Sequence, residues 1–203
     1  MPKIDHDTKQ KILLAAEKVF HRNGFKGTRT NQIAEEAGIS RTMLHYYFRT
    51  KESLFKEVLE GTIAIVFVHM KRMIGRQTDL ETLIGGIVDV ISDLFEAKPG
   101  LPNFVINLFN ESEELIHFLA GSQEDTIPAQ LDAILRNEKQ KGVVAENVRG
   151  EDLILHIYSL CSFPYLAMNY IKAKENRDDE AMKAFFRQRR DNIKSFVING
   201  IRP

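Results

Sequence analysis

Apolar residues recur along this chain every three or four positions, which is the spacing of an amphipathic α-helix. The pattern is clear from Thr8 to Gly24, where the residues between the apolar positions are mostly charged or polar. Asp7 or Thr8 is the expected cap at the start of this helix, and Gly24 is the expected stop. The apolar face consists of Ile12, Ala15, Ala16, Val19 and Phe20.

Two short helices are predicted next, separated by the turn sequence AGIS. The first begins after a cap at Thr28 or Thr30 and ends at Gly38, a residue that can adopt the conformation of a tight turn. The second covers Arg41 to Phe48, and Ser40 is placed to cap its start. Ile39 and Leu44 are apolar at positions where two crossing helices would hold each other.

The rest of the chain continues in the same way, without a strand-like alternation of useful length, so the predicted fold class is all-α. We expect a small domain at residues 1–50 that leads straight into a helix of a larger domain at residues 51–203. Pro164 is expected to kink the long helix that contains it. The further helices are predicted at 51 to about 76, 80–97, 103 to about 120, 128–141, 151–174 and 178 to about 199.

Composition narrows the class of protein. The 203 residues are 43% hydrophobic, and 28 Lys or Arg balance 28 Asp or Glu. Residues 1–60 nevertheless hold eleven basic against eight acidic residues, a local balance of +3. The single cysteine, Cys161, allows no internal disulfide and fits a reducing compartment. The polar N-terminus lacks a signal-peptide core and no apolar run reaches a membrane span, so we expect a cytoplasmic protein.

The two short helices and their turn have the arrangement of a helix-turn-helix, whose second helix enters the DNA major groove. Once the residues with structural roles are set aside, the second helix presents Arg41, Thr42, His45 and Tyr46 outward. These side chains supply hydrogen-bond donors, acceptors and an aromatic ring beside positive charge. Such a surface suits a phosphate-bearing partner. Tyr47 and Phe48 are expected in the core.

Over about residues 9–60 the chain resembles the DNA-binding domain of the TetR family of transcriptional regulators. The resemblance rests on TNQIAEEAGIS, on LHYYF and KESLF after it, and on ILLAAEKVFHRNGFKGT before it. It implies a three-helix DNA-binding head, a helical ligand-binding body and a homodimer held by the last two long helices. Where the family most often has tyrosine, this chain has His45, which is consistent with a pH-dependent contact.

The resemblance also implies which residues contact double-stranded operator DNA. Three lie at the start of the second helix, five on the third helix and its cap, and one at the start of the fourth, where the family's lysine approaches phosphate. Ser40 is a candidate both as cap and as contact. The predicted DNA-binding residues are Thr28, Arg29, Thr30, Ser40, Arg41, Thr42, His45, Tyr46 and Lys51.

The body contains many large, adaptable apolar side chains with a few polar groups among them, the composition of a small-molecule site. An alternative interpretation of each of these residues is that it belongs to the hydrophobic core and contacts no ligand. The candidate ligand-binding residues are Phe67, Met70, Phe104, Asn107, Phe109, Glu111, His117, Tyr158, Phe163 and Met168. His69 and His117 lack neighbours at metal-ligand spacing, so no metal and no cofactor is predicted.

The helix at 151–174 is apolar on more than one face and therefore needs cover on both sides. A second subunit would supply it, together with the apolar stripe of the last helix. A two-fold dimer would also place two reading helices about one DNA turn, or a multiple of it, apart. The candidate dimerisation residues are Ile157, Cys161, Phe185, Ile193, Phe196 and Val197.

These patterns favour a dimeric transcriptional regulator that binds an operator and responds to a small effector. A repressor released by an apolar effector is expected, with an activator as the alternative. An all-α enzyme is disfavoured because no nucleophile-base arrangement, HExxH or phosphate loop occurs. The third hypothesis is a helical module that binds a protein partner and has no DNA-binding activity. The net positive charge of residues 1–60 argues against it.

Overall fold

The computed structural model describes the backbone of residues 5–75, 79–111, 117 and 127–203. Within these ranges it also describes the side chains, except those of residues 63, 65–67, 69 and 108–111. The described chain is helical and contains no strand, which confirms the all-α fold class. It divides into two compact units, one made of Met1–Ile65 with Asn103–Gly121 and the other of Val66–Pro102 with Ser122–Pro203.

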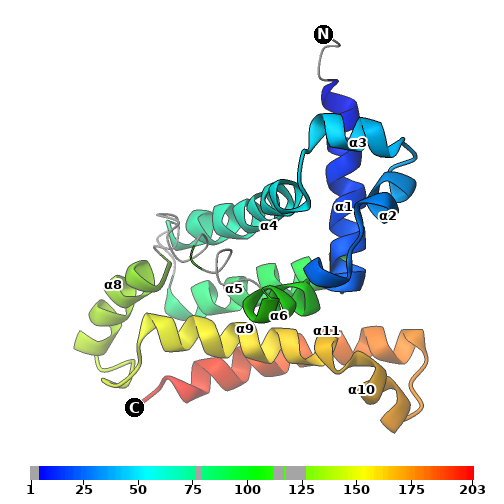
Figure 1. The fold of residues 1–203 in the computed structure, drawn as a ribbon. Helices are drawn as coiled ribbons and strands as arrows, with labels where there is room; N and C mark the ends of the chain where they lie inside the picture. The colour runs from blue at the N-terminus through cyan, green and yellow to red at the C-terminus, as the bar shows by residue number, and fades with distance from the viewer. Residues whose placement is uncertain (1–4, 76–78, 112–116, 118–126) are drawn as a thin grey trace. The chain divides into compact units, whose positions relative to one another are not determined.

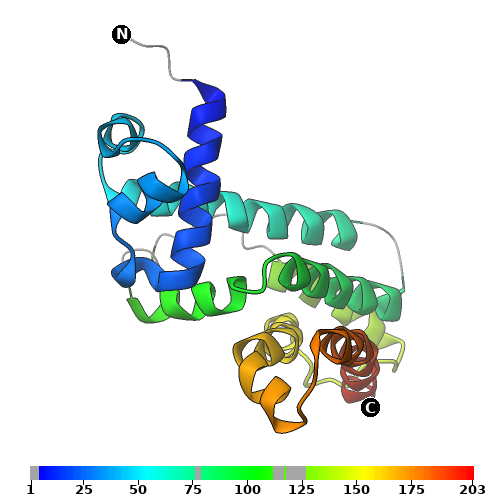
Figure 2. The same cartoon turned by 90° about the vertical axis from the view of Figure 1, so that its right-hand side faces the viewer.

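The first unit contains the predicted three-helix head and more. Its helices are α1 (His6–Gly27), α2 (Thr30–Glu36), α3 (Arg41–Tyr47), the first part of α4 (Lys51–Ile74) and most of α6 (Leu101–Glu111). Figure 2 shows α3 nearly end-on, beside α1 and α2. The unit therefore extends beyond the boundary predicted at residues 50 and 51, because the start of α4 and residues of α6 pack with the head.

The core of the first unit is centred on Phe55 of α4. Its ring lies 4.8 Å from the rings of Phe20 and Phe25 and 5.2 Å from that of Phe104. Aromatic pairs at such separations add to the hydrophobic burial of their rings. The buried apolar residues of α1 are those that the sequence pattern predicted: Ile12, Ala15, Ala16, Val19 and Phe20.

The ends of α1 differ from the prediction in one respect. Asp5, and neither Asp7 nor Thr8, is the N-cap, because its carboxylate accepts the backbone N–H of Asp7 and the hydroxyl of Thr8. The Thr8 hydroxyl is the main reason that the pKa of Asp5 is lowered. Gly24 interrupts the helix as predicted, with φ at 69° and ψ at 176°. The residues after it form a last turn.

The second unit is a bundle of α5 (Leu80–Ala97), α8 (Ile127–Gln140), α9 (Gly150–Leu166), α10 (Met168–Lys174) and α11 (Asp179–Gly200), together with the end of α4. In Figure 1, α9 (yellow) and α11 (orange to red) run side by side, and both also contact α5. Their shared core has an aliphatic part beside the buried ring of Phe95. It contains Ile84, Ile87, Val88, Ile91, Leu153, Ile157, Cys161, Ile193 and Val197.

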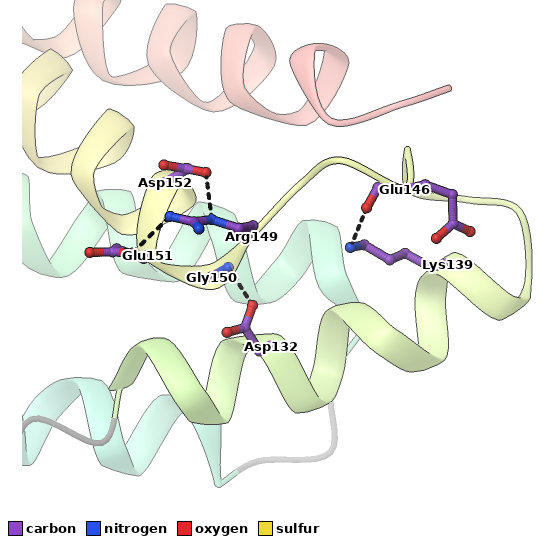
Figure 3. A network of polar contacts seen from close by, with 7 residues as sticks. All are labelled: Asp132, Lys139, Glu146, Arg149, Gly150, Glu151 and Asp152. Atoms are coloured by element: carbon purple, nitrogen blue, oxygen red, sulfur yellow. Dashed lines mark hydrogen bonds and ion pairs between the residues drawn. The ribbon is translucent and has the colours of Figure 1, made fainter.

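The sequence predicted one helix from 151 to 174, and the structure divides it at Ala167, between α9 and α10. Pro164 lies inside α9, three residues before this break, and has no backbone N–H to donate to the carbonyl four residues earlier. The start of α9 is tied to α8, as Figure 3 shows. The backbone N–H of Gly150 donates to the Asp132 carboxylate at 2.6 Å, while Arg149 pairs with Asp152 at 3.1 Å.

Candidate nucleic-acid interface

The turn between α2 and α3 is built from backbone hydrogen bonds around a glycine. Gly38 has a φ of 62°, in the left-handed region that a residue with a Cβ rarely adopts. The amides of Gly38 and Ile39 donate to the carbonyls of Glu35 and Ala34, each at 3.0 Å. Ser40 then starts α3, because its Oγ accepts the backbone N–H of Met43 at 3.1 Å. The predicted cap of α3 is confirmed, and the turn fixes where the helix begins.

One face of α3 is buried and the opposite face is open. Leu44 and Phe48 are only 2% and 6% exposed. At 100° per residue, the direction opposite them passes between Thr42 and Tyr46. The side chains of Arg41, Thr42, Met43, His45 and Tyr46 are all exposed. The four residues of α3 predicted to read bases are therefore all exposed, and so is Met43, which the sequence analysis did not nominate.

Tyr47 joins the end of α3 to the start of α1. Its hydroxyl oxygen accepts the backbone N–H of Asp5 at 3.2 Å, and its ring meets that of Tyr46 edge-on at 5.4 Å between centroids. Tyr47 is half-buried, whereas Phe48 is buried with Lys9 above its ring. The run of aromatic residues thus serves two purposes, since Tyr46 is exposed and its two successors hold the helix in place.

Thr28 does not have the role that the sequence predicted. It is 2% exposed, and its hydroxyl donates to the Gly24 carbonyl at 2.7 Å. A buried hydroxyl whose proton is already donated cannot also donate to a phosphate. Thr28 therefore closes the turn after α1, which corrects its assignment as a DNA-contacting side chain.

The start of α2 is exposed. Arg29, and neither Thr28 nor Thr30, occupies the N-cap position, and its backbone N–H donates to the Gln32 side chain at 2.9 Å. The Arg29 side chain is exposed and Thr30 is half-exposed. Both are placed where they can approach a phosphate, so their role as DNA contacts stays a prediction.

Lys51 is turned toward its own chain. Its ammonium group donates to the carbonyls of Phe25 at 2.8 Å and of Thr28 at 3.1 Å. The same group lies 4.4 Å from the centroid of the Phe25 ring, a cation–π arrangement. Two of its three N–H groups are thereby occupied, so Lys51 positions the turn before α2. Only the third N–H group is left for a contact with a DNA phosphate.

The candidate ligand residues are distributed over both units. In the first unit, Phe104 is buried, with its ring 4.8 Å from that of His21, Asn107 is half-buried, and His117 is exposed. In the second unit, Met70 is buried, Met168 is half-buried and Phe163 is 66% exposed. The remaining three candidates, Phe67, Phe109 and Glu111, have side chains outside the described residues.

Tyr158 is the ligand candidate with the most unusual surroundings. Its ring packs edge-on against Phe95 at 5.7 Å. Its hydroxyl oxygen is inaccessible to solvent and has no hydrogen-bond partner within the described part of the chain. Burial raises the pKa of this hydroxyl to about 12, so it is a neutral donor at physiological pH.

The candidate dimerisation residues divide into buried and exposed ones. Ile157, Cys161, Ile193 and Val197 are 0–5% exposed because α5, α9 and α11 cover them within one chain. Phe185 is half-buried, with the Arg177 guanidinium 4.9 Å from its ring centroid. Phe196 is 69% exposed and is the one candidate whose ring is free to contact a second subunit.

Sequence reasoning did not assign the other exposed apolar residues of α9 and α10 to the dimer interface, although it nominated Phe163 for the ligand site. These are Leu155 at 55%, Phe163 at 66%, Leu166 at 39% and Tyr170 at 67%. Leu155 and Phe163 are eight residues apart on α9 and so share a face, which periodicity predicts once the buried face through Ile157 is known. A groove of about 620 Å³ lies between α9 and α11, lined by His156, Ser159, Leu160 and Phe196 among others.

The described residues contain no cluster of three or more His, Cys, Asp or Glu that could hold a metal ion. Burial raises the pKa of the Cys161 thiol to about 11, so the reactive thiolate is scarce at neutral pH. No helix of the described chain is long and apolar enough to cross a lipid bilayer.

A glycine turn, a capped second helix and an exposed polar and aromatic face on that helix together define a helix-turn-helix DNA-binding protein. The comparisons with known proteins specify the family. The sequence model of the bacterial regulatory proteins of the tetR family matches residues 12–58. The chain is 30% identical over 161 residues to the HTH-type transcriptional repressor NicS of Pseudomonas putida, a match that covers 77% of this chain and 74% of that protein. The chain therefore belongs to the TetR family of transcriptional regulators.

Other relatives agree over a longer span. The HTH-type transcriptional regulator RutR of Escherichia coli K12 is 29% identical over 204 residues, which covers 96% of this chain and 91% of RutR. Among solved structures, FadR from Bacillus subtilis in complex with stearoyl-CoA has a TM-score of 0.70 at 16% identity and covers 95% of this chain and 98% of FadR. FadR from Bacillus halodurans has a TM-score of 0.68 at 16% identity, and the match covers 98% of this chain and 99% of that FadR. These structures show that the fold is shared.

Proposed function

We propose that this protein is a dimeric, cytoplasmic repressor that binds operator DNA through α3 and is released by a small apolar effector. The observation that carries the proposal is the exposure of Arg41, Thr42, His45 and Tyr46 on α3, a helix fixed at both ends. NicS, the relative that supports the family assignment, is named a repressor, which favours repression over activation.

The contacts with DNA follow from the chemistry of the exposed side chains. Arg41 stands in the first turn of α3, the part of a recognition helix that reaches base edges, and arginine pairs in a bidentate manner with guanine. Arg29, at the start of α2, is a candidate to contact a DNA phosphate. The imidazole of His45 can donate to a phosphate or to a base edge. Lys51 contributes by holding the turn before α2.

The dimer is expected to use the exposed apolar face of α9 and α11 rather than their buried stripe. In a two-fold interface the same patch serves both subunits, so that a side chain of one copy meets a recess of the other. Phe196 is exposed beside the groove between α9 and α11. A two-fold axis near this groove would place each Phe196 against the other copy, with Leu155 and Phe163 extending the apolar contact.

The effector is expected in the helical body, at the hydroxyl of Tyr158. An inaccessible hydroxyl without a partner costs free energy, which a polar group of a bound molecule would recover. The neighbouring Phe95 ring is apolar, so the proposed effector is largely apolar with one hydrogen-bonding group. Binding releases the repressor if the effector prefers a spacing of the two heads that does not match the operator.

DNA binding is tested with the fragment upstream of the protein's own coding region and, if that fails, with sequences selected from random DNA. Affinity is measured over a salt series for the wild type, for Arg41→Ala/Tyr46→Ala and for the control Arg187→Ala on the exposed surface of α11. Tight binding that weakens steeply with salt and is lost in the double variant alone supports the proposal. Equal binding by all three proteins, or no sequence selected from random DNA, overturns it.

The dimer and the effector have separate tests. Sedimentation of the wild type at micromolar concentration should give a dimer, and Phe196→Asp should give a monomer, whereas the exposed-leucine control Leu14→Asp on α1 should not. A small-molecule screen for release of the DNA complex should yield compounds that act about tenfold more weakly on Tyr158→Phe, the loss expected for one buried hydrogen bond. A monomeric wild type, or compounds indifferent to the Tyr158 change, contradicts the respective part of the proposal.

A further inference from the structure

Met43 is an apolar side chain left open on a polar surface. It is 45% exposed in the first turn of α3, whereas the next residue, Leu44, is 2% exposed. Its immediate neighbours on the open face are Thr42 and Tyr46, which carry hydroxyl groups. Burial within its own unit therefore does not explain a methionine at this position.

The backbone at Met43 is fixed. Its N–H donates to Ser40 Oγ at 3.1 Å, which orders the first turn of α3, and the buried side chains of Leu44 and Phe48 fix the rotation of the helix about its axis. At 100° per residue, Met43 and His45 flank the open face on opposite sides, with Thr42 and Tyr46 between them. A recognition helix uses its first turns to contact base edges. Met43 is thus aimed at one border of the base-contacting surface.

The chemistry of the side chain limits what it can recognise. A thioether has no donor and is a weak acceptor, so Met43 cannot bind a phosphate as Arg41 can. In the major groove, the apolar group on a base edge is the C5-methyl group of thymine. A methionine is flexible and polarizable, and it can fit its terminal methyl group against such a target.

We propose that Met43 contacts the C5-methyl group of a thymine in each operator half-site and so contributes to sequence specificity. This inference rests on the proposed function, because it requires α3 to lie in the major groove. A protein partner is disfavoured as the occupant, since the neighbouring residues on the open face, Thr42 and Tyr46, carry hydroxyl groups and the local surface is not an apolar patch. Met43 and Arg41 belong to the same helix, so their contacts keep a constant register along the DNA.

The test uses an operator selected from random DNA, in which each thymine is replaced in turn by deoxyuridine, which lacks only the methyl group. For the wild type, one replacement per half-site should weaken binding about threefold to fivefold, the effect of burying one methyl group. Met43→Ala should bind the parent operator more weakly, and the same replacement should leave its affinity unchanged. Its salt dependence should equal that of the wild type, because no phosphate contact is lost.

The outcomes separate this inference from the proposed function. Failure to select any operator overturns both. An operator whose affinity is indifferent to every deoxyuridine replacement, or a Met43→Ala variant with the wild-type sensitivity, overturns the role of Met43 and leaves the regulator intact. A thermal unfolding curve of Met43→Ala that coincides with that of the wild type confirms that the exposed side chain acts through DNA and not through the fold.

Discussion

The ammonium group of Lys51 lies 2.8 Å from the carbonyl oxygen of Phe25, at the junction of α4 with the turn that follows α1. It also donates to the Thr28 carbonyl at 3.1 Å. The Phe25 carbonyl, in the last turn of α1, also accepts the backbone N–H of Thr28 at 3.3 Å, and the Thr28 carbonyl lies just beyond the end of that helix. Lys51 therefore acts as a clip that sets where α2 begins relative to α1 and α4 within the first unit.

Replacing Lys51 with methionine should destabilise this unit without removing any DNA contact from α3. The stem is kept, but two carbonyls lose a charged donor, so we expect unfolding to become easier by about 1–3 kcal/mol. Thermal and urea unfolding measure the change, with Arg22→Met as the control because Arg22 is an exposed cation of α1. If both variants unfold together with the wild type, the clip contributes nothing to the fold.

Gly38 and Gly61 should respond in opposite directions to the same substitution. Gly38 has a φ of 62°, so an alanine there is strained although the nearest atom to a new Cβ, Lys11 Nζ, is 3.7 Å away. We expect a loss of about 1–2 kcal/mol in stability. Gly61 is in α4, and a Cβ added there would meet open space. Gly61→Ala should therefore raise the free energy of unfolding by about 0.5–1 kcal/mol.

Urea unfolding of the two variants measures the backbone strain at Gly38, and operator binding measures whether the DNA-binding surface of α3 is retained. Because the turn sets the direction of α3, Gly38→Ala should also weaken DNA binding, whereas Gly61→Ala should bind as the wild type does. Equal stability of the two variants would mean that the turn tolerates a Cβ and that its geometry does not depend on glycine.

Gly150 should be the least replaceable glycine of the second unit. A Cβ there would clash with the Pro128 carbonyl oxygen and lie 2.9 Å from Leu131 Cβ, so α8 and α9 would have to separate. The same residue donates its N–H to Asp132 at 2.6 Å (Figure 3). We expect Gly150→Ala to cost about 2 kcal/mol or more, the effect of overpacking at a close helix contact.

The matched control is Gly85→Ala in α5, where the nearest atom to a new Cβ is Lys194 Cδ at 3.9 Å. That helical site should gain stability from alanine. Asp132→Ala, which removes the acceptor and leaves the close contact in place, should cost less than Gly150→Ala. The order of the three urea midpoints is the measurement, and a Gly150→Ala midpoint at or above that of Gly85→Ala would refute the close packing of α8 on α9.

The sequence predicted local features well because they depend on neighbouring residues. The bounds Leu80–Ala97 of α5 agree with the prediction, since a strong apolar stripe follows the Asp79 cap, whose carboxylate accepts the Thr82 N–H at 2.8 Å. The cap at Ser40 and the turn at Gly38 were predictable for the same reason.

Features that depend on long-range packing were not predictable. Lys51 and Phe25 are 26 residues apart, and no pattern in the sequence pairs them. The two apolar faces of α9 are both visible in the sequence, but only the fold shows that the face with Ile157 is covered by α5 and α11 while that with Leu155 is open. Most of the candidate dimer residues therefore lie on the face that is covered within one chain.

Cys161 should be inert in the folded protein and should make stability fall at alkaline pH. It is buried in α9, where loss of solvent raises the pKa of its thiol from 9.0 to about 11, although a hydrogen bond with Ser92 opposes the shift. The folded state thus keeps its proton in a range where the unfolded state has lost it. The stability due to the neutral thiol is fully present below pH 9 and is lost as the pH rises toward 11.

Two measurements follow from this assignment. An aromatic disulfide reagent at pH 8 should label the only cysteine of the chain many times faster in denaturant than in buffer, because the thiolate is both exposed and abundant only after unfolding. Between pH 9 and 11, the free energy of unfolding should fall more steeply for the wild type than for Cys161→Ala. Burial also raises the pKa of Tyr158 and Tyr165 to about 12, but these residues are common to both proteins and cancel in the comparison. Rapid labelling of the native protein, or equal slopes, would show that α9 does not shield Cys161.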